Sequence, residues 1–226
     1  MSPAAAVRDV VIGSHSKVWH GLSRHIGAAR TPPLAIGHRE VAGFAFTPRD
    51  RVWVLSYSRL PAENAALLDR LRHAGAGELV YVSSSSVIVS QITSCYEYPR
   101  VKLRAELDAL TLPNSRVLTI GLMYEEPSEL PGGADVATSF AELATFFSAP
   151  EWPEDAGRRK RLFRVVRRPF TSAIERVAHE VYGQLLQWSG RFPCLLRPLD
   201  LLLRALGARW YGYVYLSNRQ WISTTS

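Results

Sequence analysis

Short apolar strands alternate with helical stretches along the first 150 residues, and this alternation constrains the fold most. Four runs are almost continuously apolar, at residues 7–12, 51–56, 78–82 and 116–120. The stretches between them have helical periodicity, at residues 14–29, 60–74 and 97–110. Continuous apolar strands are typical of a parallel sheet that helices cover on both faces. The sequence therefore predicts an α/β protein with a Rossmann-like, doubly wound parallel sheet.

The composition changes after residue 150. Residues 151–157 have the polar, proline-containing composition of a linker, residues 172–188 are expected to form an amphipathic helix, and residues 192–216 are rich in leucine and aromatic residues. Shorter elements are expected before this point, namely strands at residues 34–36 and 41–46 and a helix at residues 139–148. The two expected domains are a Rossmann-like domain, 1–150, and a small, mostly helical C-terminal substrate lobe, 151–226.

The chain is basic, with a net charge of +7 and an isoelectric point near 9.7. This balance suits an anionic ligand or surface, although many basic proteins have no such ligand. Seven basic residues and no acidic one lie within residues 158–168. The run is compatible with a solvated start of a helix, with pairing to the diphosphate of a nucleotide sugar, or with binding to anionic lipid or nucleic acid. No motif of a nucleic-acid-binding module accompanies it, so we expect no nucleic-acid partner.

Cysteine and histidine positions indicate neither a metal site nor a disulfide framework. Cys95 and Cys194 have no metal-ligand spacing, which favours a reducing cytoplasm. His15, His20 and His25 are five residues apart and so do not share a helix face. The sequence also lacks a secretory signal and an apolar run of about 18 residues, as a membrane span requires.

The leucine-rich segment 192–216 has two interpretations. Pro193 and Pro198 interrupt it, so it is too broken to span a membrane. It is compatible with a core helix of the C-terminal lobe. It is also compatible with a segment at the surface of the inner membrane, with its aromatic rings at headgroup depth.

The strongest chemical signal is a tyrosine and a lysine four residues apart, Tyr98 and Lys102, after a strand that ends in four serines, Ser83–Ser86. On a helix, residues four apart lie on one face. An ammonium group beside a phenol stabilises the phenolate and lowers its pKa, which suits the phenol for proton transfer near neutral pH. A serine hydroxyl can hold a carbonyl or alcohol oxygen against it. Together these groups can transfer a proton at a carbonyl or alcohol oxygen while the attached carbon gains or loses a hydride. Hydride transfer of this kind requires a nicotinamide cofactor.

Ser83-Ser-Ser-Ser86 and Tyr98-Pro-Arg-Val-Lys102-Leu-Arg-Ala-Glu106 resemble the active site of the short-chain dehydrogenase/reductase superfamily. The closest branch is the extended one, whose epimerases, dehydratases and reductases act on nucleotide sugars, often in the synthesis of surface polysaccharides. The resemblance implies that Tyr98 is the acid/base and that Lys102 binds the nicotinamide ribose. It implies a substrate-orienting hydroxyl from Ser84, with Ser85 as the rival. It also implies a homodimer through helices 60–74 and 97–110.

The expected cofactor is NAD or NADP, held by Gly13, Ser14, Ser16, Lys17, Arg39, Ser56 and Lys102. The family motif Gly-x-x-Gly-x-x-Gly is reduced here to Gly13, because Ser16 and Trp19 stand at the other two positions. Arg39 suits the 2′-phosphate of NADP, with a solvated arginine as the alternative.

Three hypotheses follow. The first is an NAD(P)-dependent epimerase or reductase acting on a nucleotide-linked sugar, with dehydration disfavoured because Ser85 and Ser86 offer no acid. The second is a non-catalytic relative that acts as a binding or regulatory subunit, which the altered glycine turn supports. The third is an unrelated α/β binding protein.

Overall fold

The computed structural model describes residues 7–27, 32–56, 58–150, 152, 157–170, 172–189, 193–205 and 211–225. The chain divides into two compact units that are each assembled from separate segments. Unit 1 comprises residues 1–83, 104–119 and 140–162, and unit 2 comprises residues 84–103, 120–139 and 163–226. The domain boundary expected at residue 150 stays a prediction.

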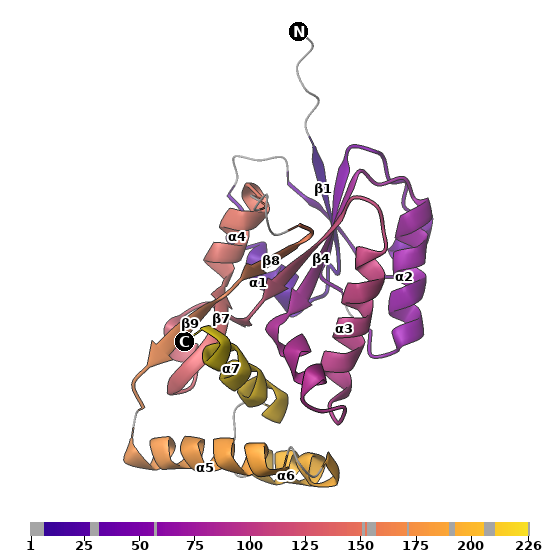
Figure 1. The fold of residues 1–226 in the computed structure, drawn as a ribbon. Helices are drawn as coiled ribbons and strands as arrows, with labels where there is room; N and C mark the ends of the chain where they lie inside the picture. Colours follow the sequence, from indigo (N-terminus) through magenta and orange to yellow (C-terminus); the bar gives the residue numbers. More distant parts are fainter. Residues whose placement is uncertain are drawn as a thin grey trace. The chain divides into compact units, whose positions relative to one another are not determined.

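Unit 1 is built on a six-stranded sheet in the order β2-β1-β3-β4-β5-β8 (Figure 1). Its strands are β1 (Arg8–Ile12), β2 (Leu34–Ile36), β3 (Asp50–Val54), β4 (Glu78–Ser84), β5 (Ser115–Ile120) and β8 (Arg159–Leu162). Strand β1 pairs in parallel with β2 and β3, and β3 pairs in parallel with β4. The expected Rossmann-like, doubly wound α/β fold is therefore confirmed.

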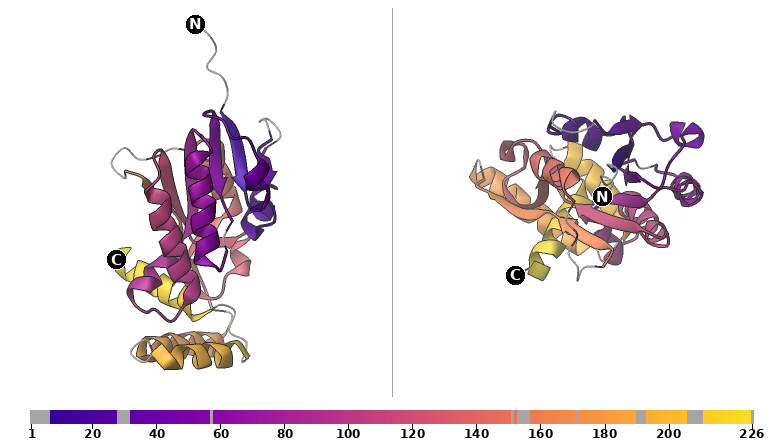
Figure 2. Two further views of the ribbon diagram at one scale, coloured as in Figure 1. Left: turned by 90° about the vertical axis from the view of Figure 1, so that its right-hand side faces the viewer. Right: turned by 90° about the horizontal axis from the view of Figure 1, so that it is seen from above.

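Helices cover both faces of this sheet. The helices of the alternating region are α1 (Lys17–Leu22), α2 (Pro61–His73), α3 (Glu97–Leu110) and α4 (Phe140–Ser148). Val52 and Val54 of β3 belong to the core under α2 and the second half of α3, which lie side by side in Figure 2. Trp53 lies between them in sequence and faces α4, with its ring centroid 4.6 Å from that of Phe147. Because strand side chains alternate in direction, the apolar residues 52–54 of β3 supply both cores.

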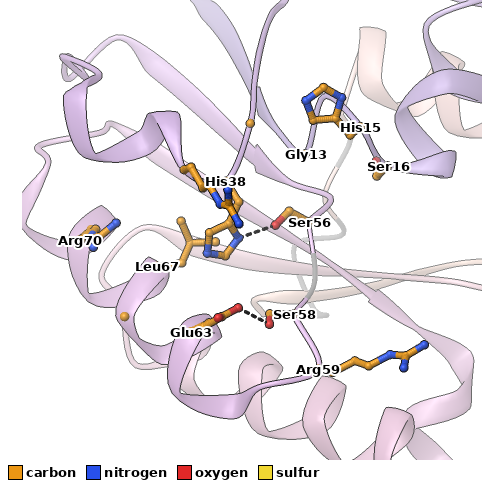
Figure 3. Close-up of a pocket in the computed structure, with 13 residues that line it drawn as sticks. Gly13, His15, Ser16, His38, Ser56, Ser58, Arg59, Glu63, Leu67 and Arg70 are labelled. Atoms are coloured by element: carbon orange, nitrogen blue, oxygen red, sulfur yellow. Dashed lines mark hydrogen bonds between the residues drawn. The ribbon is translucent and has the colours of Figure 1, made fainter.

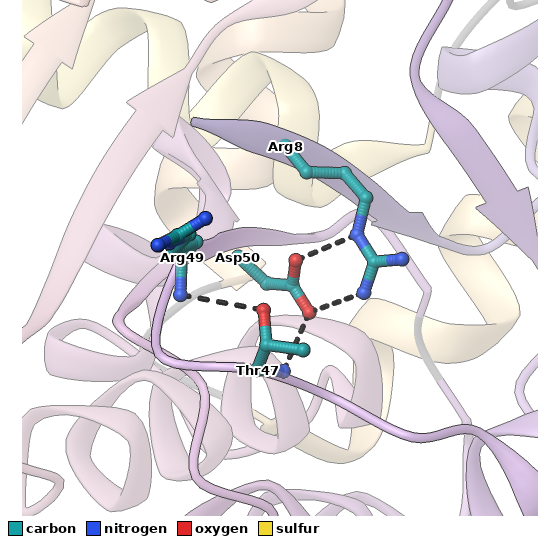
Figure 4. Close-up of polar contacts among 4 residues, drawn as sticks. All are labelled: Arg8, Thr47, Arg49 and Asp50. Atoms are coloured by element: carbon teal, nitrogen blue, oxygen red, sulfur yellow. Dashed lines mark hydrogen bonds and ion pairs between the residues drawn. The ribbon is translucent and has the colours of Figure 1, made fainter. Parts of the chain in front are cut away.

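An ion pair between exposed Arg8 and buried Asp50 joins β1 to β3 (Figure 4). Arg8 stands opposite Asp50 in the strand register, and its Nε and Nη2 atoms donate to the two Asp50 carboxylate oxygens, each at 2.7 Å. The backbone N–H of Thr47 donates to the same carboxylate at 2.7 Å. The hydrogen bonds from Arg8 lower the pKa of Asp50 more than burial raises it.

Unit 2 contains a three-stranded sheet in the order β6-β7-β9, with helices around it. Its elements are β6 (Leu122–Tyr124), β7 (Gly133–Ser139), β9 (Arg164–Arg168), the 3-10 helices η2 (Ser85–Gln91) and η3 (Pro127–Glu129), the start of α3, and α5 (Ala173–Ser189), α6 (Pro193–Ala205) and α7 (Gly212–Thr225). One apolar core joins η2 and the residue just before α3 to the last three helices and is made of Val89, Tyr96, Tyr182, Leu186, Leu196 and Leu216.

Two expected elements of the N-terminal region are wrong. The helix expected at residues 14–29 spans only Lys17–Leu22, where Gly21 and Leu22 are the buried residues, and residues 28–29 of the expectation lie outside the described part. The strand expected at residues 41–46 is instead a 3-10 helix, η1, spanning Glu40–Gly43. Its only buried residue is Val41, so these residues do not extend the sheet.

The basic run 158–168 does not begin a helix. It forms β8 and β9, with side chains that alternate in exposure through most of the run. Several of its cations have structural partners: Arg159 pairs with Glu106 at 2.7 Å, and Arg158 donates to the carbonyls of Leu110 and Leu112. The sequence RRKRLFRVVRR has no apolar alternation with a period of two, so these strands had no clear signal in the sequence.

The leucine-rich segment 192–216 is not one core helix. Its described part contains α6 and the start of α7, which continues to Thr225. Leu196 is fully buried, whereas Leu201 and Leu202 are 72% and 57% exposed. No helix in the described part of the chain is long and apolar enough to cross a membrane. Contact of this segment with a membrane surface stays a prediction.

Candidate functional site

A pocket of about 730 Å³ opens in unit 1 at the carboxyl ends of three neighbouring strands (Figure 3). Gly13 follows β1, His38 follows β2 and Ser56 follows β3, and all three line the pocket. Strand β1 lies between β2 and β3, so the strand order reverses here. In open α/β sheets, ligands bind at this reversal, outside the carboxyl ends of the strands.

Gly13 makes the tight turn that shapes the pocket floor. Its φ of +114° lies in the region that L side chains rarely adopt. A Cβ atom at this position would lie 2.9 Å from the backbone nitrogen of Ser56. Both restraints act on the glycine that remains from the family motif, so a side chain here would strain the turn and push into the wall of the pocket.

The other residues expected on this turn have different positions. Ser16 lines the pocket and also caps α1, where its Oγ accepts a hydrogen bond from the N–H of Trp19 at 3.0 Å. Its hydroxyl proton can still be donated to a ligand. Ser14 and Lys17 are not among the residues that line the pocket, and Lys17 is exposed.

The rim of the pocket is more basic than the sequence indicated. Arg39, as expected, and also His15, Arg59 and Arg70 line it, and all four residues are exposed. The last three were not predicted from the sequence. Arg59 comes three residues after Ser56 at the end of β3, and this position after a parallel strand was the available signal.

Two internal hydrogen bonds hold the polar side of the pocket. His38 Nδ1 lies 2.8 Å from Ser56 Oγ, which joins the segments after β2 and β3. The Ser58 hydroxyl donates to the carboxylate of Glu63 on α2. Ser56 was an expected cofactor ligand, while His38 and Glu63 were not. Figure 3 shows both contacts on the same side of the pocket.

The serine, tyrosine and lysine of the predicted chemistry all belong to unit 2. Ser84 is half-buried, and its Oγ lies 2.9 Å from that of Ser86. Burial raises the pKa of Tyr98, and a hydrogen bond between its side chain and that of Ser84 lowers it by a smaller amount. Of the two rival serines, Ser84 is therefore the one hydrogen-bonded to Tyr98.

Lys102 lies one helical turn after Tyr98 on α3 and is 5% exposed. A buried lysine needs polar or anionic surroundings, because its desolvation is costly. Glu106, one turn further, lies in unit 1 and accepts a hydrogen bond from the Ser83 hydroxyl at 2.7 Å in addition to its ion pair with Arg159. The motif residues on α3 thus divide between the units: Tyr98 and Lys102 belong to unit 2, whereas the Glu106 carboxylate is held within unit 1 by Ser83 and Arg159.

Among the described residues, no group of three or more His, Cys, Asp or Glu side chains is arranged to hold a metal ion. His15 lines the unit 1 pocket, and the ring of His20 contacts the carbonyl of Ser16 at 2.9 Å within its own helix.

No family model and no curated protein sequence matches this chain. Solved structures do. The chain is similar to a nucleoside-diphosphate-sugar epimerase from Staphylococcus aureus, with a TM-score of 0.54 and 12% identity, over 94% of this chain and 90% of that one. It is similar to the enzyme WbmG from Bordetella bronchiseptica, solved with NAD and UDP, with a TM-score of 0.52 and 9% identity, over 74% of this chain and 77% of that one. The fold implied by the resemblance to the extended short-chain dehydrogenases is therefore confirmed.

Proposed function

We propose that this protein is an NAD(P)-dependent oxidoreductase or epimerase that acts on a nucleotide-linked sugar, of the kind that supplies surface-polysaccharide synthesis. The observation that carries the proposal is the hydrogen bond between Ser84 and Tyr98, one helical turn from buried Lys102, in a chain with this fold. The named ligands of similar structures, NAD and UDP in WbmG, support the choice of cofactor and substrate class.

The unit 1 pocket has the chemistry of a dinucleotide site. Gly13 lets the turn after β1 pack directly on Ser56, where a Cβ atom would collide, and such a glycine turn is typical of a dinucleotide site. Exposed guanidinium groups from Arg39, Arg59 and Arg70 supply donors for phosphate oxygens. The Glu40 carboxylate near the end of β2 already accepts a hydrogen bond from the N–H of Gly37, which makes it less available to accept one from the adenine ribose of NAD. This arrangement favours NADP, whose 2′-phosphate suits arginine, over NAD.

A nicotinamide, when bound, accepts or returns a hydride at the substrate carbon. Tyr98 takes the proton of the substrate hydroxyl as the hydride leaves that carbon, and it returns the proton in the reverse direction. Ser84 donates to the same oxygen and orients it. Lys102 favours the phenolate of Tyr98 by its charge. In an epimerase, Tyr98 would take and return the proton within one turnover, whereas in a reductase it would give its proton to the substrate oxygen once.

A second candidate is a non-catalytic binding or regulatory subunit. Two observations favour it: burial raises the pKa of Tyr98, and Ser16 occupies a glycine position of the nucleotide-binding turn. Both would be unfavourable in an enzyme that uses this tyrosine as a base near neutral pH. The subunit would keep the fold and bind a dinucleotide weakly or not at all.

Substitution of Tyr98 by phenylalanine separates the two candidates. In the enzyme, Tyr98→Phe abolishes hydride exchange with a panel of nucleotide sugars and leaves NADPH affinity within about twofold. Ser86→Ala is the matched control, because Ser86 contacts Ser84 and has no assigned role in proton transfer. The proposal is wrong if Tyr98→Phe retains the wild-type rate, and the subunit is favoured if wild type exchanges no hydride.

A further inference from the structure

The C-terminal helix α7 contacts the candidate catalytic segment at two places within unit 2. At its second turn from the end, Trp221 Nε1 donates a hydrogen bond of 2.9 Å to the backbone carbonyl of Ser85. At its first turn, the ring of Tyr213 stacks on the ring of Tyr98. One helix therefore touches both the serine segment and the tyrosine of the proposed proton transfer.

The contact between Tyr213 and Tyr98 is part of an ordered stack of rings. The two ring centroids are 5.4 Å apart and the planes differ by 28°. Tyr211 stacks near Tyr213 at 5.5 Å and 10°, and Tyr96 meets Tyr213 edge-on at 5.5 Å. The guanidinium of Arg204 lies 3.9 Å from the centroid of the Tyr211 ring. Aromatic pairs in such offset and edge-to-face arrangements stabilise one another beyond their buried area.

The start of α7 is held close to this stack by Asp200 and Gly212. Asp200 on α6 is buried, and its Oδ1 accepts hydrogen bonds from the N–H of Gly212 at 2.6 Å and from the Tyr182 hydroxyl at 3.2 Å. A Cβ atom on Gly212 would lie 2.8 Å from the Leu186 side chain and would also meet the Tyr96 hydroxyl. Glycine and the carboxylate together fix the first turn of α7, and that turn carries Tyr213.

We propose that Tyr213 is a positioning residue for the reaction of Tyr98. This inference rests on the proposed function, since it gives Tyr213 a role only if Tyr98 transfers a proton. Stacking limits rotation of the Tyr98 ring and keeps its hydroxyl on Ser84. It also keeps water from one face of the ring. Tyr213 acts through Tyr98 and is not itself a donor or acceptor of the reacting proton.

Three variants test this role. Tyr213→Ala removes the ring, and Tyr213→Phe keeps it without the hydroxyl. Tyr215→Ala is the matched control, because Tyr215 lies on the same helix and packs on Tyr182, with ring centroids 4.4 Å apart. If Tyr213→Ala does not fold by circular dichroism, Tyr213→Leu replaces it, because leucine keeps most of the apolar volume without a ring.

The first readout does not depend on activity. Tyrosine is labelled with ¹³C at Cζ, and the Tyr98 signal is assigned by its loss in Tyr98→Phe. We expect the pKa of Tyr98 to fall in Tyr213→Ala, because water reaches the exposed ring face, and to stay at the wild-type value in Tyr213→Phe and Tyr215→Ala. Equal titration of Tyr98 in wild type and Tyr213→Ala overturns the proposal.

The second readout is the rate. We expect kcat to fall about threefold to tenfold in Tyr213→Ala, the range that matches the worth of one aromatic pair, with KM nearly unchanged and with rescue in Tyr213→Phe. Equal loss of kcat in Tyr213→Ala and Tyr215→Ala would indicate general loosening of α7 and would overturn the proposal. If the wild-type protein shows no turnover, the proposed function is wrong. The NMR titration of Tyr98 still reports whether the Tyr213 ring covers it.

Discussion

The ion pair between Arg8 and Asp50 predicts a large and pH-dependent loss of stability when its carboxylate is replaced. In Asp50→Asn, the amide offers one oxygen to the donors of Arg8 and Thr47 and turns an N–H₂ group toward one of them. The Asp50 side chain is fully buried, whereas that of Arg8 is 44% exposed, so water relieves only part of the mismatch. Leaving buried donors without an acceptor costs about 1–3 kcal/mol. We expect Asp50→Asn to lower the free energy of unfolding by that amount at pH 7.

The sign of the pH dependence follows from the lowered pKa of Asp50. A carboxylate with a lowered pKa stabilises the fold above its unfolded-state pKa, and this stabilisation is lost as the pH falls through the folded-state value. The difference between wild type and Asp50→Asn should therefore shrink below about pH 4. Urea unfolding followed by circular dichroism measures it, with hydrogen exchange of the β1 and β3 amides as the local readout. Asp108→Asn is the control, because Asp108 pairs with Arg104 at the surface and such pairs contribute less than about 1 kcal/mol. Equal losses in both variants, or a difference that persists at low pH, would refute the reasoning.

Three further predictions concern other parts of the chain. Gly13→Ala should lower the melting temperature and weaken NADPH binding at least tenfold, measured by differential scanning fluorimetry and calorimetry, while Gly27→Ala, where a Cβ meets open space, changes neither. Arg70→Ala should weaken NADPH binding more than NADH binding in the same titration, because only NADPH carries a 2′-phosphate; an equal effect would assign Arg70 to another contact. Burial raises the pKa of Asp135 to about 6, so its stabilising effect is complete at acidic pH and is lost as the pH rises through about 6. Asp135→Asn should therefore flatten the pH dependence of urea unfolding between about pH 4 and pH 7, and an unchanged slope would contradict this.

Much of unit 1 could be predicted from the sequence, because its strands are continuous apolar runs. The run that includes Val52, Trp53 and Val54 fills cores on both faces of the sheet, and a short apolar run of this kind is typical of a strand buried on both sides. The glycine at position 13 also lies where the resemblance implied, at the end of β1.

Unit 2 was harder to predict because charged residues interrupt its strands β7 and β9. Strand β7 begins at Gly133, includes the buried Asp135 and was not expected from the sequence. The Asn218 side chain on α7 donates to the Asp135 carboxylate at 2.6 Å, a contact between residues far apart in the chain. No local pattern reveals such a pair.

In the candidate site as well, positions along one helix could be predicted from the sequence, whereas contacts between segments far apart in the chain could not. The spacing of Tyr98 and Lys102 on one helix face was readable, because helix geometry fixes it. The hydrogen bond between Ser84 and Tyr98 and the stacking of Tyr213 on Tyr98 could not be predicted, because both depend on how separate segments pack.

Calorimetric titration of the purified protein with NADPH and NADH tests the central claim most directly. If unit 1 holds a nicotinamide dinucleotide, NADPH binds with one site per chain, more tightly than NADH, and Tyr98→Phe leaves this binding within about twofold. Absence of binding for both dinucleotides at millimolar concentration would contradict the assignment of an NAD(P)-dependent enzyme.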